Sequence, residues 1–82
     1  MKIYILNVIN GGGLHTSAFT TLEKALSCAK DMFAEEAEGY YRHNGFDNMP
    51  DLDEEVKGLR ENGHAFPEFT ADEYYLKEVE VH

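Results

Sequence analysis

The stretch KIYILNVIN, residues 2–10, decides the fold because it is the most apolar of the predicted strands and is rich in strand-forming residues. Apolar side chains occur on both of its alternating faces, so we expect a strand that is covered on both faces or lies centrally in its sheet. The run Asn10 to Gly13 tolerates positive φ and predicts a reversal into a second strand, Leu14–Phe19. This second strand is shorter and more polar, which is typical of an edge strand.

A long helix is predicted after this hairpin. Thr20 and Glu23 have the spacing of a capping box, in which each side chain satisfies a backbone donor of the other residue. Apolar residues then recur at steps of three and four from Leu22 to Tyr40, which predicts a helix with one apolar face. The helix ends near Gly39 or continues through residues 41–42.

The second half of the chain predicts a shorter helix and one more strand. We expect a loop over residues 43–50, a helix over Asp51–Asn62, a connector over 64–70 and a strand over Tyr74–Val81. The last strand is expected to pair with the first. The sequence therefore predicts a single α+β domain, residues 1–82, with a small three-stranded, mainly antiparallel sheet and two helices packed on one face.

Composition excludes several classes of protein. The chain has 82 residues, a formal net charge of -9 and 43% hydrophobic residues, which is enough apolar content to exclude a disordered acidic tail. Strong acidity argues against direct binding to nucleic acid or to an anionic membrane, since both need clustered Lys and Arg. No apolar run approaches the roughly 20 residues of a membrane span. With one cysteine and no signal-peptide pattern after Met1, we expect a cytoplasmic protein.

The motifs that could carry chemistry are weak. The glycines at 11–13 lie between two strand-like segments with no lysine directly after them, so a flexible hairpin is a better explanation than a phosphate loop. The four histidines show no metal-ligand spacing, and the calcium-loop pattern that starts at Asp51 fails at its sixth and twelfth positions. Cys28 fits a helical packing residue better than a nucleophile. We therefore expect no enzyme activity, no cofactor and no metal.

The negative charge is concentrated after residue 30. Residues 1–30 hold three lysines and one glutamate, whereas residues 31–82 hold 15 acids and four bases. On the first predicted helix Asp31, Glu35 and Glu38 lie within about 60° of one another, at axial steps of about 6 Å and 4.5 Å. These steps approach the spacing of phosphates along one nucleic-acid strand. An acidic helix face can equally be a solvated surface that keeps the chain soluble.

Further candidate residues adjoin this helix face. Glu36 falls within the apolar arc, where a solubilising residue is not needed unless the helix there passes the sheet edge. Tyr41 is the better surface candidate of the pair at 40–41, and Phe46 and Met49 are residue types common at interfaces. The predicted partner-binding residues are Asp31, Glu35, Glu36, Glu38, Tyr41, Phe46, Asp47, Asp51 and Asp53.

Several segments resemble small phage and prophage accessory proteins, a group that includes anti-CRISPR proteins. The resemblance is carried by the opening MKIYIL, the glycine-rich turn, the FTTLEKA start of the first helix at residues 19–25 and the EVEV of residues 78–81. It covers about half of the chain, and the segment 40–69 lies outside it. It implies a small acidic, phage-encoded binding protein and carries over no catalytic residue.

Two functions follow from these observations. The first is an inhibitor that binds a basic host protein or nucleoprotein complex, with carboxylates occupying Lys and Arg sites that otherwise hold phosphates. The alternative is a homo-oligomeric structural or assembly protein, which pairs through the edge strand at 14–19 or through the loop near Phe46 and Met49. A small enzyme or metal-binding domain is a third and weaker hypothesis.

Overall fold

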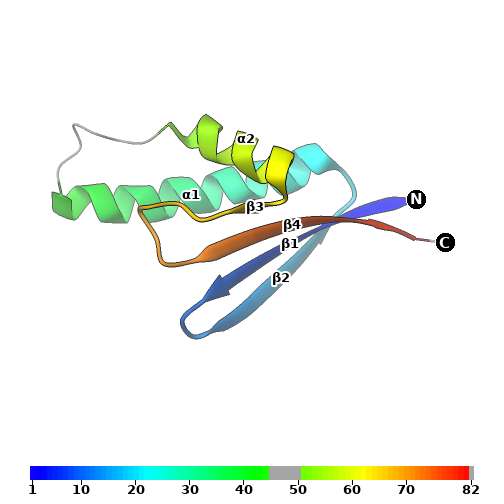
Figure 1. Ribbon diagram of the computed structural model, residues 1–82, viewed down its shortest axis with the longest axis horizontal. Helices are drawn as coiled ribbons and strands as arrows, with labels where there is room; N and C mark the ends of the chain where they lie inside the picture. The colour runs from blue at the N-terminus through cyan, green and yellow to red at the C-terminus, as the bar shows by residue number, and fades with distance from the viewer. Residues whose placement is uncertain (45–50, 82) are drawn as a thin grey trace.

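A four-stranded antiparallel sheet forms one layer of the molecule, and two helices form the other (Figure 1). The computed structural model describes residues 1–44 and 51–81. The order of the strands across the sheet is β2-β1-β4-β3, so β1 is central and β2 lies at an edge. The elements are β1 (Lys2–Asn10), β2 (Gly13–Phe19), α1 (Leu22–Asn44), α2 (Leu52–Asn62), β3 (His64–Ala65) and β4 (Glu73–Glu80).

The predicted α+β class is confirmed, and the predicted number of strands is corrected. The last strand, β4, pairs with β1 in the antiparallel sense, as expected. The connector after α2 contains a strand that the sequence did not predict, β3, in which His64 pairs with Tyr75 and Ala65 with Tyr74. Because β3 has only two residues, it is too short to show the alternation by which a strand is recognised.

The two faces of β1 lie in different environments. Leu6 and Val8 are buried in the core on the face that the helices cover. Ile9 points to the opposite face and is 38% exposed, and Ile3 and Ile5 on that face are half-buried. Of the two expectations for this strand, the central position is confirmed, whereas no described residue of the chain covers its second face.

The core lies between the sheet and the helices and is centred on Phe33 of α1. Its ring meets that of Tyr74 at 4.6 Å between centroids and that of Phe69 at 6.2 Å, both edge to face. Leu59 brings α2 into the same cluster. Edge-to-face aromatic pairs add to the stabilisation from burial, so these rings fix both helices on the sheet.

The first helix differs from its predicted bounds at both ends. Its cap is Thr21, whose Oγ1 accepts a hydrogen bond from the Lys24 N–H at 3.2 Å, so the capping box expected at Thr20 and Glu23 is wrong. At the other end α1 continues through Gly39 to Asn44, which confirms the longer of the two expected ends. Figure 1 shows the C-terminal turns of α1 extending beyond the ends of the strands.

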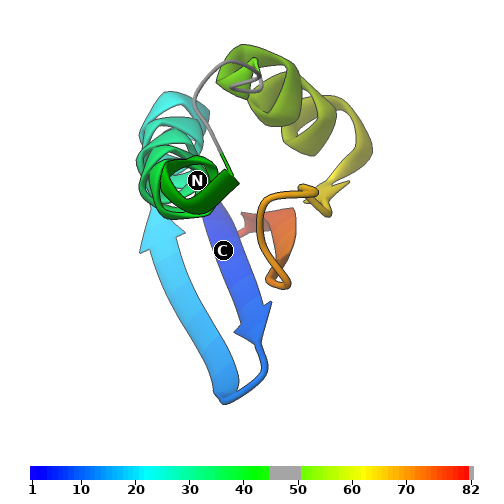
Figure 2. The same ribbon diagram turned by 90° about the vertical axis from the view of Figure 1, so that its left-hand side faces the viewer.

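The helices divide the covered face of the sheet between them. The first helix packs over β1 and the Phe19 end of β2, and α2 packs over β4 and β3 (Figure 2). The side of α1 that faces away from α2 therefore lies on the same side of the molecule as the free edge of β2. None of the described helices is apolar enough over a sufficient length to cross a membrane.

Candidate functional site

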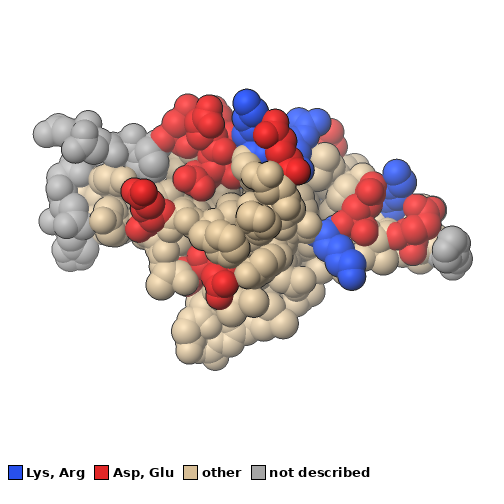
Figure 3. Space-filling model, viewed as in Figure 1, with Lys and Arg blue, Asp and Glu red and all other residues tan. Residues whose placement is uncertain are grey.

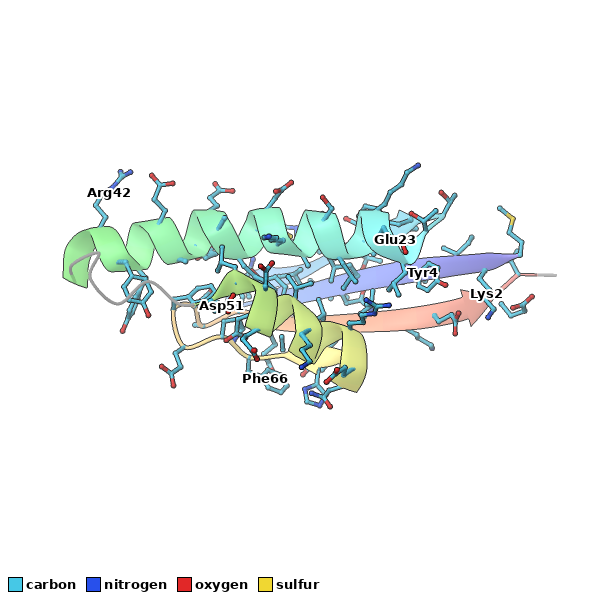
Figure 4. All side chains as sticks on the ribbon, turned by 90° about the horizontal axis from the view of Figure 1, so that it is seen from above. Lys2, Tyr4, Glu23, Arg42, Asp51 and Phe66 are labelled. Atoms are coloured by element: carbon cyan, nitrogen blue, oxygen red, sulfur yellow. The ribbon has the colours of Figure 1, made fainter. Side chains whose placement is uncertain are left out.

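The acidic face of α1, defined by Asp31, Glu35 and Glu38, is exposed as predicted. Figure 4 shows side chains with oxygen tips projecting in a row from the side of α1 that faces away from α2, with Arg42 at the end of the row. Arg42 Nη2 donates to Glu38 Oε1 at 2.5 Å. Among the described residues, the carboxylates of Asp31 and Glu35 form no ion pair and accept no hydrogen bond.

Glu36 lies on a different side of α1 from the acidic face. It is exposed although the periodicity of the helix placed it among the apolar residues, because this part of α1 extends past the strands. Its charge reaches Tyr74: burial and, to a smaller extent, the charges of Asp72, Glu36 and Glu35 together raise the pKa of the Tyr74 hydroxyl to about 12. Glu36 therefore contributes to the field at the end of the core.

Two of the predicted acids have structural roles in α2. The side chain of Asp51 is the N-cap of α2 and accepts a hydrogen bond from the Asp53 N–H at 3.0 Å. Asp53 Oδ1 lies 2.7 Å from Lys30 Nζ of α1, and this contact, by hydrogen bonding and charge, raises the lysine pKa. The structure thus places Asp51 and Asp53 at the start of α2 and the contact between the helices, away from the acidic face of α1.

Of the two aromatic residues predicted to bind a partner, Tyr41 and Phe46, the structure describes only Tyr41. Tyr41 is half-buried against the core, whereas its neighbour Tyr40 is 43% exposed, so the choice of Tyr41 as the surface residue is wrong. The two rings meet edge to face at 5.0 Å between centroids. Phe46 and Asp47 lie outside the described residues, as does Met49.

The edge strand β2 is a second exposed surface. It lies on the side of the molecule that faces away from α2, as the acidic face of α1 does. Its residues GLHTSAF include no charged side chain and no proline, and Gly13 to Ala18 are all exposed. Proteins usually protect a long edge strand with charges, prolines or bulges, because its unpaired backbone groups can pair with another chain. The opposite edge of the sheet, β3, has only two residues. The unprotected edge is therefore β2.

The pairing of β1 shows which backbone groups of β2 are free. In an antiparallel sheet successive residues of a central strand bond alternately to its two neighbours. The N–H of Val81 donates to the carbonyl of Met1 at 2.7 Å, so odd-numbered residues of this strand bond toward β4 and even-numbered ones toward β2. The residues of β2 whose N–H and C=O groups point to the free edge are Leu14, Thr16 and Ala18.

The open face of the sheet carries a third surface, which is apolar and aromatic. A hollow of about 500 Å³ there is lined in part by Ile9, Leu14 and Tyr75, and Leu14 is 61% exposed. Beside it the Phe66 ring, 55% exposed, stacks on His64 and meets Tyr75 edge to face. The sequence analysis predicts that these aromatic residues lie in a connector and a strand, and it assigns them no binding role. The adjacent Tyr74 and Tyr75 could have indicated an exposed aromatic residue, since strand alternation points one side chain inward and the next outward.

The other residues considered for chemistry, which are Cys28, the possible metal ligands and the glycine-rich turn, lie in places that a structural role explains. Cys28 is half-buried against the core cluster. Within the part of the chain that the structure describes, no three His, Cys, Asp or Glu side chains gather as a metal site requires. The glycine-rich turn joins β1 to β2, where Asn10 Oδ1 accepts a hydrogen bond from the Gly12 N–H at 3.1 Å.

Comparisons of the chain with protein-family models, with curated proteins and with solved structures find no match. The surfaces that the fold presents are the acidic face of α1, the free edge of β2 and the apolar open face of the sheet. Figure 3 shows acidic side chains over α2 and, beside Lys and Arg side chains, at the end of the molecule where the termini lie, while the tip of the β1–β2 hairpin is uncharged on this face.

Proposed function

We propose that this chain is a small acidic inhibitor, encoded by a phage and similar in action to anti-CRISPR proteins, that binds a basic nucleic-acid-binding surface of a host complex in the cytoplasm. The acidic face of α1 occupies Lys and Arg sites that otherwise bind phosphates. The binding is competitive with nucleic acid and involves no catalysis by this chain.

The observation that supports the proposal most directly is the unneutralised charge of Asp31 and Glu35. Both carboxylates are exposed on one helix face, and neither has an ion-pair partner among the described residues. An exposed row of like charges raises the rate of encounter with a surface of opposite charge and fixes the orientation of the complex. The resemblance to phage accessory proteins agrees with such a role.

Charge reversal of the two unpaired acids tests the proposal. The Asp31→Lys/Glu35→Lys variant should lose at least about tenfold in affinity for a purified CRISPR effector complex, because attraction becomes repulsion at the contact. The measurement is the concentration of the chain that displaces a fluorescently labelled DNA target from the effector. Glu38 is left intact in this variant, so its contact with Arg42 is preserved.

The matched control reverses two exposed acids elsewhere. Glu61→Lys/Glu68→Lys changes the net charge of the chain by the same amount and leaves α1 untouched. It should compete with DNA nearly as well as the unmodified chain. Equal loss in both variants would attribute the binding to net charge alone, and no displacement by the unmodified chain would refute the proposal for that effector.

The alternative, an assembly protein without an inhibitory role, is favoured by the unprotected edge of β2. It predicts a homo-oligomer that binds no basic partner. Light scattering of the purified chain, with and without a basic nucleic-acid-binding protein, distinguishes the two functions. Raising the salt concentration should weaken an electrostatic complex with such a partner, because the Debye length falls to about 8 Å at 0.15 M.

A further inference from the structure

The open face of the sheet is apolar where a solvated face would be polar. An antiparallel sheet with one face in water normally places its polar side chains on that face. The strand residues that point away from the helices here include Ile3, Ile5, Ile9, Leu14 and Val79. Both helices lie on the other side of the sheet, and no helix or strand of the described chain covers the open face (Figure 1).

The end of β4 shows this inverted pattern most clearly. Glu78 lies on the helix side of the sheet, where its carboxylate accepts a hydrogen bond from the Tyr4 hydroxyl at 3.2 Å, and Glu80 shares that side. Alternation points Val79 and Val81 to the open face, and Val81 is 39% exposed. The apolar side of this amphipathic strand therefore faces the surface that lacks a cover.

The charges on the open face form a self-complementary pair. Among the described strand residues that point there, Glu73 is the only acid and Lys77 the only base, although the chain as a whole carries -9. Both side chains are exposed, and they lie about 6.8 Å to either side of Tyr75 along β4. The Tyr75 hydroxyl donates to Glu73 Oε1 at 3.0 Å, which leaves Oε2 for another partner.

We propose that a second copy of this chain covers the open face, in a two-fold dimer in which the two β4 strands pack face to face and run in opposite directions. A two-fold axis across the strands at Tyr75 places Lys77 of each copy opposite Glu73 of the other. Aligned sheets cross at about 30°, which displaces each pair sideways by about 3 Å, within the reach of a lysine.

The same axis matches the apolar side chains of the open face. Ile9 of one copy lies opposite Ile5 of the other, and Leu14 lies opposite Ala18, because these residues occupy equivalent levels on either side of the axis. The hollow of about 500 Å³ is lined in part by Ile9 and Leu14. A large side chain of one copy thus meets a small one or a hollow of the other.

The acidity of the chain does not oppose this arrangement. Two stacked sheets lie about 10 Å apart, and the helices of each copy form a further layer outside them. The acids of the two helix layers are therefore separated by more than the Debye length of about 8 Å at 0.15 M salt. An anionic lipid surface on the same apolar face would offer Glu73 no positive charge. Charge complementarity thus favours a second copy.

The size of the face predicts a weak, reversible dimer. The three longer strands, at a spacing of about 4.8 Å and a rise of about 3.4 Å per residue, cover roughly 400 Å² of each copy. Interfaces of this size belong to transient complexes, so we expect a dissociation constant of about 10 µM or weaker. The inference goes beyond the proposed function, since the acidic face of α1 remains uncovered on both outer sides of the dimer.

Sedimentation equilibrium of the full chain, from about 1 µM to 1 mM, measures the dissociation constant of the dimer. Lys77→Glu places two pairs of like charges across the interface and should weaken dimerisation by about tenfold. Lys57→Glu is the matched control: it changes the net charge equally at an exposed position of α2 and should dimerise nearly as tightly as the unmodified chain. Lys77 is also exposed, so the fold of the single copy does not depend on it.

The double variant Glu73→Lys/Lys77→Glu provides a rescue experiment. It has the net charge of the unmodified chain and reverses both members of each pair, so attraction across the two-fold axis returns. Its dissociation constant should come within about threefold of that of the unmodified chain. An effect of net charge, or a different arrangement of the copies, would not produce this recovery.

The outcomes separate the dimer from the proposed function. A chain that stays monomeric to about 1 mM overturns the inference. Equal weakening by Lys77→Glu and Lys57→Glu, or no recovery in the double variant, also overturns it and indicates pairing through another surface such as the β2 edge. The Asp31→Lys/Glu35→Lys variant should dimerise like the unmodified chain, so failure to compete with DNA leaves the dimer measurement unchanged.

Discussion

Two adjacent tyrosines show how strand alternation gives identical residues opposite energetic roles. The hydroxyl of Tyr74 is buried and has no hydrogen-bond partner among the described residues, whereas that of Tyr75 donates to Glu73 Oε1 at 3.0 Å at the surface. A buried polar group without a partner costs free energy. Tyr74→Phe should therefore raise the free energy of unfolding by about 1 kcal/mol. Tyr75→Phe, the control, should change it by less than about 0.5 kcal/mol in urea unfolding.

The same tyrosine makes stability depend on alkaline pH. Burial, followed by the nearby carboxylates, raises the pKa of Tyr74 from 10.0 to about 12 in the folded chain. Between these values the unfolded chain loses the Tyr74 proton while the folded chain keeps it, so stability should fall as pH rises. Urea unfolding at pH 9 and pH 11 should show a smaller fall for Tyr74→Phe. An equal fall would contradict this origin.

The exposure of a side chain could be predicted from the sequence where it depends only on the helix that carries the residue. The exposure of Asp31, Glu35 and Glu38 follows from their angle on the helix. The environments of Glu36 and Tyr41 do not, because they depend on how far α1 extends beyond the sheet and on which side the core continues. Both are tertiary properties, which the period of a single helix does not contain.

At the scale of the elements, α2 depends on its cap. The side chain of Asp51 accepts from the Asp53 N–H, and three acids in the first turn favour the same end of the helix dipole. Asp51→Ala should destabilise the chain by about 1 kcal/mol and lower Tm by roughly 4–8 °C, whereas Asp51→Asn retains the cap. Equal melting temperatures for the two variants in calorimetry would show that the cap contributes nothing.

The sequence predicts the long elements well and the short one not at all. The strands at both ends and the stop of α2 at Gly63 follow from local patterns; Gly63 has a φ of 76° and donates its N–H to Leu59 O at 2.9 Å. The strand β3 exists because β4 offers it an edge, as in the bond from the Leu76 N–H to Gly63 O at 2.8 Å. Such a strand has no signal of its own.

At the scale of the whole molecule, self-repulsion should limit stability. A net charge of -9 on 82 residues disfavours the compact state, and the ion pairs that oppose it, such as Lys30 with Asp53, are exposed and weak. Raising NaCl from about 0.01 M to 0.15 M should therefore raise Tm in a thermal scan, because the Debye length falls from about 30 Å to 8 Å. The less acidic Asp31→Lys/Glu35→Lys variant should respond less. A fall in Tm with salt would show that the ion pairs dominate.

The combination of surfaces is the part of the candidate site that the sequence could not predict. The acidic face of α1 and the edge character of β2 were both expected from local patterns. Their position on one side of the molecule depends on α2 packing over β4 and β3, which leaves α1 beside the free edge. That arrangement is decided by long-range contacts, such as those of Phe33 with Tyr74 and Phe69.

The presence of core and exposed acidic residues on the same helix has an evolutionary consequence. The acids proposed to bind a partner, Asp31 and Glu35, share α1 with Phe33, the centre of the core, and lie on its exposed face. Recognition and folding are thus encoded in one stretch of the gene, at different positions of the helical period. Substitutions at the exposed positions can change which partner is bound while the buried positions continue to specify the same fold.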